Sequence, residues 1–199
     1  MVLLIPVTLG AALLGMFIAY SRFDGWFAFS HSILTGLAWI FLLMANLVKE
    51  EELESFLNFG FSEFQAKIYY ILWRLITWVD AAWNQSINND NYVFIFEISF
   101  LLWALTYFGM WSIFRYGYTW RAVVPVGVVL LISTYCAPQP TVGFLMIFCL
   151  LTLFFLVRTN LAEQQLRWRE RGLYLGQDVT FDFLRDGLLY STIVLSLAW

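Results

Sequence analysis

The chain of 199 residues is 61% hydrophobic and only 13% charged, whereas a soluble domain averages about 45–50% apolar and about 25% charged residues. This composition excludes an ordinary soluble domain and predicts an integral membrane protein. The net charge of −3 is small and the charged residues are mixed with apolar runs, so we do not expect nucleic acid as a partner.

Five long apolar segments predict complete membrane spans, because a helix needs roughly 20 apolar residues to cross the hydrocarbon layer. The five segments are Val2–Tyr20, Phe27–Val48, Tyr92–Phe114, Trp120–Ala137 and Thr141–Val157. They predict an all-α fold, a polytopic membrane helical bundle. No shift in composition marks a second domain, so we expect one transmembrane domain over residues 1–199.

Two features predict how these spans pack. Ala11, Gly15 and Ala19 recur at intervals of four residues, so they share one helix face on which a neighbouring backbone can approach closely. The fourth and fifth segments are joined by little more than Pro138-Gln139-Pro140, which predicts a tight antiparallel hairpin.

Residues 61–83, between the second and third spans, predict an amphipathic helix that lies in the headgroup layer. One side of its helical wheel carries polar residues and the other carries apolar ones. The polar set is Glu63, Lys67, Arg74 and Thr77, and the apolar set is Phe64, Ile68, Ile71, Leu75 and Val79. A further membrane span is the competing interpretation, but Lys67, Arg74 and Asp80 make it costly.

The last part of the chain combines a basic connection with a short apolar run. Residues 158–186 predict a cytoplasmic connection whose first half is helical, with Glu163 and Arg167 spaced for an ion pair. Gly187–Trp199 is apolar for only thirteen residues. We interpret this run as a partial sixth span, the first part of a longer helix.

The distribution of basic residues predicts the orientation of the chain in the membrane. If the connection after the first span faces the cytoplasm, eight arginines lie inside and only Lys49, Lys67 and Arg74 lie outside. The inside set is Arg22, Arg115, Arg121, Arg158, Arg167, Arg169, Arg171 and Arg185. Within it, Arg167, Trp168, Arg169 and Arg171 are candidate contacts to anionic lipid headgroups.

Candidate catalytic residues are scarce. His31 is the only histidine, which excludes a histidine-rich metal site, and we expect it to lie at the cytoplasmic interface without a catalytic role. Cys136 and Cys149 lie in apolar stretches at depths that do not match His31, so a Cys–His nucleophile pair is not expected. The sequence therefore predicts no catalytic site, no metal and no cofactor.

Glu97 is the candidate polar site inside a span. An ionisable residue in a membrane helix is a functional hypothesis by default. The alternative is that its carboxyl group reaches the headgroups, or is neutral and hydrogen-bonded to a neighbouring helix. We favour this alternative because no second buried acid or base is placed to relay a proton.

Several stretches together resemble a known family. "NDNYVFIFEISFLLWALTYFGMWSIFRYGYTWRAVVPVGVVLLISTYCAP", "LVRTNLAEQQLRWRERG" and "DVTFDFLRDGLL" are similar to the N-terminal membrane region of bacterial transglutaminase-like membrane proteins. The resemblance implies several spans followed by an extracytoplasmic domain with a Cys-His-Asp triad. No position of this chain matches that triad, so the resemblance implies the membrane region without the catalytic domain.

These observations lead to two hypotheses of function for a multi-pass protein of the bacterial plasma membrane. The first is a non-catalytic accessory or anchoring module that packs against other integral membrane subunits and the lipid bilayer. The larger assembly would be one such as a respiratory or photosynthetic quinol-oxidising electron-transfer complex, similar to alternative complex III. The second is the membrane anchor of an extracytoplasmic transglutaminase-like enzyme domain. A transporter is less favoured, because the sequence contains no inverted repeat.

Overall fold

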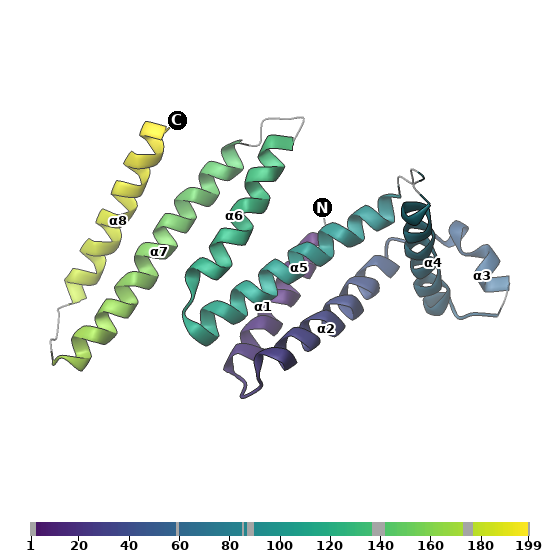
Figure 1. Ribbon diagram of the computed structural model, residues 1–199, viewed down its shortest axis with the longest axis horizontal. Helices are drawn as coiled ribbons and strands as arrows, with labels where there is room; N and C mark the ends of the chain where they lie inside the picture. Colours follow the sequence, from purple (N-terminus) through teal and green to yellow (C-terminus); the bar gives the residue numbers. More distant parts are fainter. Residues whose placement is uncertain are drawn as a thin grey trace. The chain divides into compact units, whose positions relative to one another are not determined.

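The computed structural model describes residues 3–58, 60–84, 86, 90–136, 142–172 and 177–198, and within them it is helical throughout, with no strand (Figure 1). The elements follow in chain order. They are α1 (Leu4–Tyr20), α2 (Gly25–Ala45), the short 3-10 helix η1 (Glu50–Glu52), α3 (Glu54–Asn58), α4 (Glu63–Trp83), α5 (Asn91–Tyr116), α6 (Thr119–Cys136), α7 (Val142–Glu170) and α8 (Gln177–Ala198).

Four of the described helices, α2, α5, α6 and α7, are long and apolar enough to cross a membrane. They coincide with the second to fifth predicted spans, which confirms the all-helical membrane class. α1 is equally apolar but has 17 residues, so it counts as a shorter apolar helix. The predicted number of five complete spans therefore stays a prediction.

The contacts group the chain into two compact units, residues 1–117 with α1 to α5, and residues 118–199 with α6 to α8. In the first unit, α1 and α2 both pack along α5. The buried side of α1 consists of Val7, Ala11, Gly15 and Ala19, which confirms the predicted small-residue face. At Gly15 an added Cβ would lie 2.5 Å from the carbonyl oxygen of Tyr107, so the two backbones are nearly in contact.

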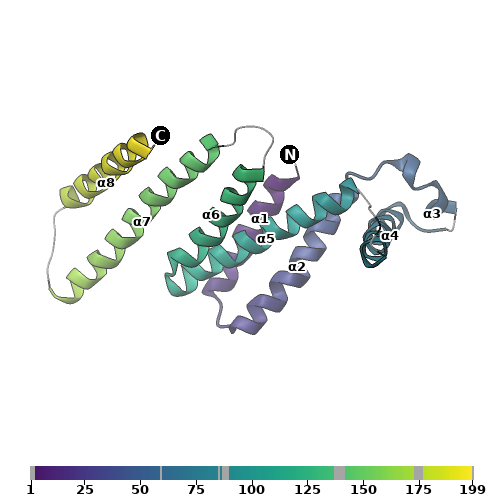
Figure 2. The same cartoon turned by 45° about the horizontal axis from the view of Figure 1, so that its top comes forward.

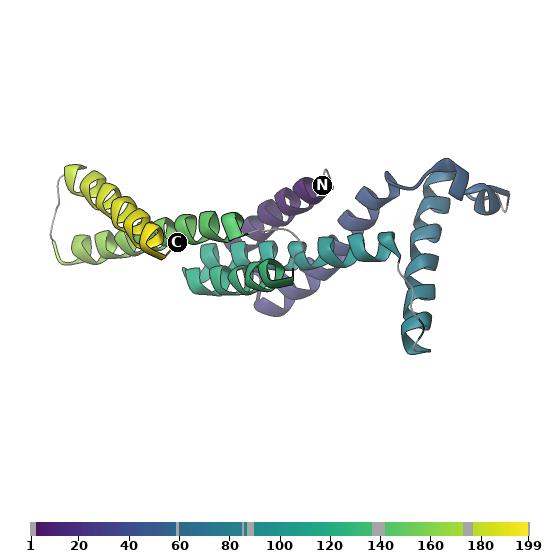
Figure 3. The same cartoon turned by 90° about the horizontal axis from the view of Figure 1, so that it is seen from above.

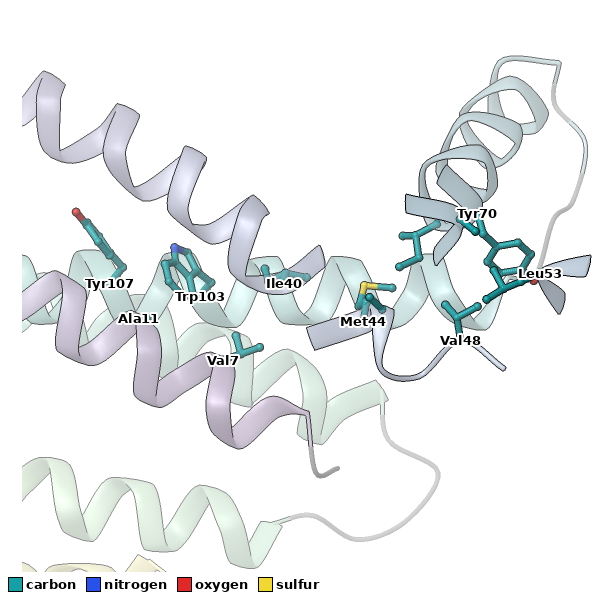
Figure 4. Close-up of a cluster of buried hydrophobic side chains, with 12 residues drawn as sticks. Val7, Ala11, Ile40, Met44, Val48, Leu53, Tyr70, Trp103 and Tyr107 are labelled. Carbon is teal, nitrogen blue, oxygen red and sulfur yellow. The ribbon is translucent and has the colours of Figure 1, made fainter. Parts of the chain in front are cut away.

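The core of the first unit runs along this seam and continues under α4 (Figure 4). Figure 4 shows the side chains of Tyr107, Trp103, Ile40 and Met44 one after another along the helices. Beyond them lies a second group that contains Val48, Leu53 and Tyr70. The apolar interior therefore joins the helix bundle to the segment that carries α3 and α4.

α4 begins with a capping box in which Ser62 and Gln65 satisfy each other's backbone N–H groups. It contacts α2, α3 and α5, and Figure 3 shows that it runs crosswise to α1, α2 and α5. It is not among the helices apolar enough to cross a membrane. This arrangement agrees with the amphipathic helix predicted over residues 61–83.

In the second unit, α7 packs against both α6 and α8, and lies between them in Figures 1 and 2. The two helices of the predicted hairpin, α6 and α7, are antiparallel and in contact; the Pro-Gln-Pro connection lies outside the described residues. The limits of α7 and α8 differ from the prediction. α7 continues unbroken to Glu170, and α8 begins at Gln177, ten residues before the predicted apolar run.

The physical reason for this difference is that helix limits are set by backbone hydrogen bonding and not by hydropathy. Ion pairs spaced three or four residues apart support these polar helical turns. Arg167 lies 3.9 Å from Glu163, and Arg185 lies 3.2 Å from Asp182. The predicted pair of Glu163 and Arg167 is thereby confirmed, and most of the predicted connection 158–186 is helix.

Candidate functional site

The seam between α2 and α5 is held by hydrogen bonds from aromatic side chains. The indole Nε1 of Trp103 donates to the carbonyl oxygen of Ser32 at 3.0 Å, and both residues are buried. Gly36, one turn further along α2, leaves room for the indole, since a Cβ there would lie 2.5 Å from Nε1. A second tryptophan, Trp39, donates to the carbonyl oxygen of Pro6 and so joins α2 to α1.

His31 lies near the beginning of α2 and is half-buried. Its Nδ1 and the hydroxyl oxygen of Tyr107, on α5, share a hydrogen bond of 3.0 Å, and the imidazole stacks on Phe27. Tyr107 itself is fully buried. The contact gives His31 a structural role as a link between two helices. Sequence reasoning missed this role, since nothing in the local pattern around residue 31 or 107 pairs the two.

The end of α5 that carries Arg115 is fastened to the connection between α1 and α2. The guanidinium of Arg115 donates to the carbonyl oxygens of Ala19 and Ser21 through Nη1, and to that of Phe23 through Nη2 at 3.1 Å. These carbonyls include one of the last turn of α1, where a cation is favoured by the helix dipole. Arg115 therefore fixes the ends of α1 and α5 to each other.

Five polar residues from η1, α4 and the beginning of α5 meet at the opposite end of α5. We call this group the corner cluster: Glu52, Tyr70, Arg74, Asp90 and Tyr92. Asp90 Oδ1 accepts a hydrogen bond of 2.9 Å from the backbone N–H of Tyr92, and thereby caps α5. Its Oδ2 lies 2.8 Å from Nε of Arg74 on α4. The direction of the Nε–H does not meet hydrogen-bond geometry, so the contact is an ion pair.

Aromatic rings and a second carboxylate complete the corner cluster. The guanidinium carbon of Arg74 lies 5.5 Å from the ring centre of Tyr70 and 5.4 Å from that of Tyr92, within cation–π range. The hydroxyl of Tyr92 donates to Glu52 at 2.9 Å. Burial, and next the neighbouring Glu52 carboxylate, raise the pKa of Tyr70 above its ordinary value, which keeps the phenol neutral.

Glu97, the predicted polar site, lies on an exposed stripe of α5. We call this stripe, formed by Phe94, Glu97, Ile98 and Leu101, the Glu97 stripe. Their spacing of three, four and seven residues places them on one helix face. Among the described residues, none forms an ion pair or a hydrogen bond with the Glu97 carboxylate. The prediction that the Glu97 carboxyl group either reaches the headgroups or bonds to a neighbouring helix therefore stays a prediction.

Three other polar residues, Asn46, Ser99 and Thr106, lie in or next to the apolar helices, and within the described residues none of them bonds to another helix. The amide of Asn46 donates to the carbonyl oxygen of Leu42 in its own helix region, at 3.4 Å. Ser99 is fully buried, and its hydroxyl has no hydrogen-bond partner within the described residues. The structure shows no bond for Thr106 either, in the part of the chain that it describes. The tryptophan and tyrosine contacts described above join the helices in their place.

The predicted lipid contacts lie together at the end of α7. Arg167, Arg169 and Arg171 are exposed and Trp168 is half-buried.

In the second unit, Cys136 is exposed, Cys149 is half-buried, and both are free thiols. Within the described ranges, no group of three His, Cys, Asp or Glu side chains is placed to hold a metal ion.

Comparisons of the chain with protein families, with curated proteins and with solved structures find no match. A functional proposal for this chain therefore rests on its geometry. The relevant features are a bundle whose helices are joined at both ends of α5, a crosswise amphipathic helix, and a carboxylate on an exposed face of a membrane helix.

Proposed function

We propose that this chain is a transmembrane accessory module that packs, through the Glu97 stripe of α5, against another integral membrane subunit of a larger assembly. A quinol-oxidising electron-transfer complex is the kind of assembly that we favour. The single observation that carries this proposal is the exposed Glu97 carboxyl group, which lacks a partner within the described residues.

The position of Glu97 along α5 supports an intramembrane contact. Glu97 is six residues after Asn91, the first residue of α5, so it lies about 9 Å along the helix. The 26 residues of α5 extend over about 39 Å, compared with about 30 Å for the hydrocarbon layer. A carboxyl group on the lipid-facing side of such a helix is unfavourable unless it reaches the interface or finds a hydrogen-bond donor.

The residues around Glu97 favour another membrane helix as the element that supplies the hydrogen-bond donor. Phe94, Ile98 and Leu101 surround the carboxyl group with exposed apolar surface over about two turns. One polar group within an apolar stripe is the usual composition of an interface between membrane helices, where packing supplies affinity and a hydrogen bond supplies register. The partner chemistry that fits is an apolar helix with one hydrogen-bond donor, such as Asn, Gln, Ser or a basic residue.

Two substitutions test the proposal, on protein purified from its native membrane. Glu97→Gln keeps a hydrogen-bonding side chain of the same size, so we expect the partner subunits to co-purify as before and their activity to persist. Glu97→Leu removes the hydrogen bond, so we expect co-purification to fall about five- to thirtyfold, which corresponds to the roughly 1–2 kcal/mol measured for such bonds in membranes.

The unfolding of the isolated chain separates a contact between subunits from one within the chain. We expect Glu97→Leu to leave the resistance of the isolated chain to denaturing detergent unchanged. If Glu97→Leu destabilises the isolated chain and spares co-purification, the Glu97 stripe is an internal contact and the proposal is wrong. Loss of turnover with normal assembly in Glu97→Gln would assign a proton-handling role to Glu97 instead.

The anchor of a transglutaminase-like extracytoplasmic domain remains the alternative proposal, and it rests on the sequence resemblance alone. Peptide mass spectrometry of the native protein distinguishes the two. Co-purifying membrane subunits favour the accessory module, and peptides from a transglutaminase-like domain favour the anchor.

A further inference from the structure

The first unit contains an apolar groove where α4 crosses α2. It has a volume of about 370 Å³ and takes its lining from these two helices alone. The lining residues are Ala38, Phe41 and Leu42 of α2, and Phe64, Ile68 and Leu72 of α4. We call it the α2–α4 groove; it is separate from the Glu97 stripe, which belongs to α5.

The groove lies between the last two turns of α2 and the first half of α4. Leu42 and Ala38 precede the last residue of α2, Ala45, by three and seven residues, so they lie roughly 4 to 11 Å inside its end. α2 is apolar enough to cross a membrane. The α2 wall of the groove is therefore at the depth where acyl chains begin.

The exposed apolar face of α4 continues from the groove toward the end of the helix. A second hollow of about 400 Å³ is lined by Leu72, Leu75, Ile76, Val79, Asp80 and Trp83. The polar residue Arg74, in contrast, points to the corner cluster. α4 thus turns Arg74 to Asp90, while its exposed apolar side chains lie on another side of the helix, as in an interfacial helix.

A charge pair lies next to the groove residues on α4. Lys67 and Glu63 form an ion pair, and they directly precede Ile68 and Phe64 in the sequence. Lys67 is partly covered while Glu63 is exposed. An ammonium beside a carboxylate is complementary to a zwitterionic headgroup, whose phosphate pairs with Lys67 and whose amine pairs with Glu63. A purely anionic headgroup would meet the repulsion of Glu63.

We propose that the α2–α4 groove binds one acyl chain of a zwitterionic phospholipid, with its headgroup at the Glu63–Lys67 pair. From Phe64 to Leu72 the wall extends over about 12 Å of helix. This elongated, wholly apolar lining fits a segment of an alkyl chain, and the charge pair at its edge fits the headgroup of the same molecule. The bound lipid would fill the angle between the bundle and α4.

The test measures retained lipid on the full chain by native mass spectrometry, after purification in mixed micelles that contain palmitoyl-oleoyl-phosphatidylethanolamine. We expect one phospholipid on the native protein. Ala38→Phe fills the groove from α2, and Ile68→Trp fills it from α4, so each should reduce retention about tenfold, since each methylene excluded from apolar contact lowers affinity about fourfold. The matched control, Ser30→Phe, adds the same ring to an exposed position of α2 outside the groove and should leave retention unchanged.

A competition between headgroups tests the second part of the proposal. We expect the native protein to retain phosphatidylethanolamine over phosphatidylglycerol, and the double variant Glu63→Gln with Lys67→Gln to lose this preference while still retaining one lipid. Equal retention in Ala38→Phe, Ile68→Trp and the native protein would overturn the groove as the site. A preference of the native protein for phosphatidylglycerol would overturn the headgroup assignment. Loss of lipid in Ser30→Phe as well would show only nonspecific contact with α2, and would also overturn the site.

Discussion

Arg74 and Asp90 join the crosswise helix α4 to the beginning of α5 through a contact of 2.8 Å between Nε and Oδ2. The Asp90 side chain is only 4% exposed, while that of Arg74 is 34% exposed. Asp90 also caps α5 with its other oxygen. One carboxylate therefore fixes both where α5 begins and how α4 is attached to it.

Removal of the cation should be costly because it leaves a buried carboxylate without its partner. We expect Arg74→Met to lower the free energy of unfolding in a denaturing detergent by about 3 kcal/mol. The double variant Arg74→Met with Asp90→Asn should recover part of this loss, since the asparagine keeps the cap without the charge. The control is Lys67→Gln on the same helix, which leaves the Glu63 carboxylate without its partner; because the Glu63 side chain is 59% exposed, water solvates it and the loss should be at most about 1 kcal/mol. Equal losses for the two pairs would contradict a special role of Asp90.

Gly15 sets the distance between α1 and α5. An added Cβ would lie 2.5 Å from a backbone oxygen of α5, which cannot move independently of its helix. We expect Gly15→Ala to lower the free energy of unfolding by about 1–3 kcal/mol, as overpacking does. Gly143→Ala is the matched control, because no atom lies within 4 Å of its added Cβ; its helix should be unchanged or slightly stabilised. A neutral Gly15→Ala would mean that α1 and α5 do not pack this closely.

The bond between Tyr107 and His31 should contribute modestly to stability. Tyr107→Phe keeps the buried ring and removes the hydroxyl, so we expect a loss of about 0.5–1.5 kcal/mol, measured by unfolding in a denaturing detergent. Tyr135→Phe removes a hydroxyl from a ring that is 92% exposed and should have no measurable effect. If the two variants behave alike, the hydrogen bond contributes nothing to stability.

The position of α4 at the membrane surface can be tested with two cysteines of equal exposure in the protein. The Glu63 side chain is 59% exposed and Val79 is 57% exposed, so only the lipid bilayer can distinguish them. In bilayers, with Cys136 and Cys149 replaced by serine, we expect a membrane-impermeant thiol reagent to label Glu63→Cys and to spare Val79→Cys. Both should react in the unfolded protein. Shielding of both in the bilayer would indicate that α4 is a buried span, and labelling of both would place α4 outside the membrane.

The sequence by itself determined the class of the protein and the course of its helices. Long apolar runs need no knowledge of their neighbours to predict spans, because the energetic cost of polar groups in hydrocarbon applies to each segment separately. The same holds for the amphipathic pattern of α4 and for the small-residue face of α1, which follow from helix periodicity alone.

Only the tertiary structure decided which side chains join the helices. His31 and Tyr107 are separated by 76 residues, and Trp103 and Ser32 by 71. Arg115 reaches the end of α1 from 96 residues away. The local sequence around each of these side chains is compatible with many partners. Which partner the side chain contacts depends on the distance and rotation at which the helix backbones pack. The close contact at Gly15 sets the distance between α1 and α5, and Asp90 attaches α4 to the beginning of α5. Hydropathy along the chain records neither of these contacts.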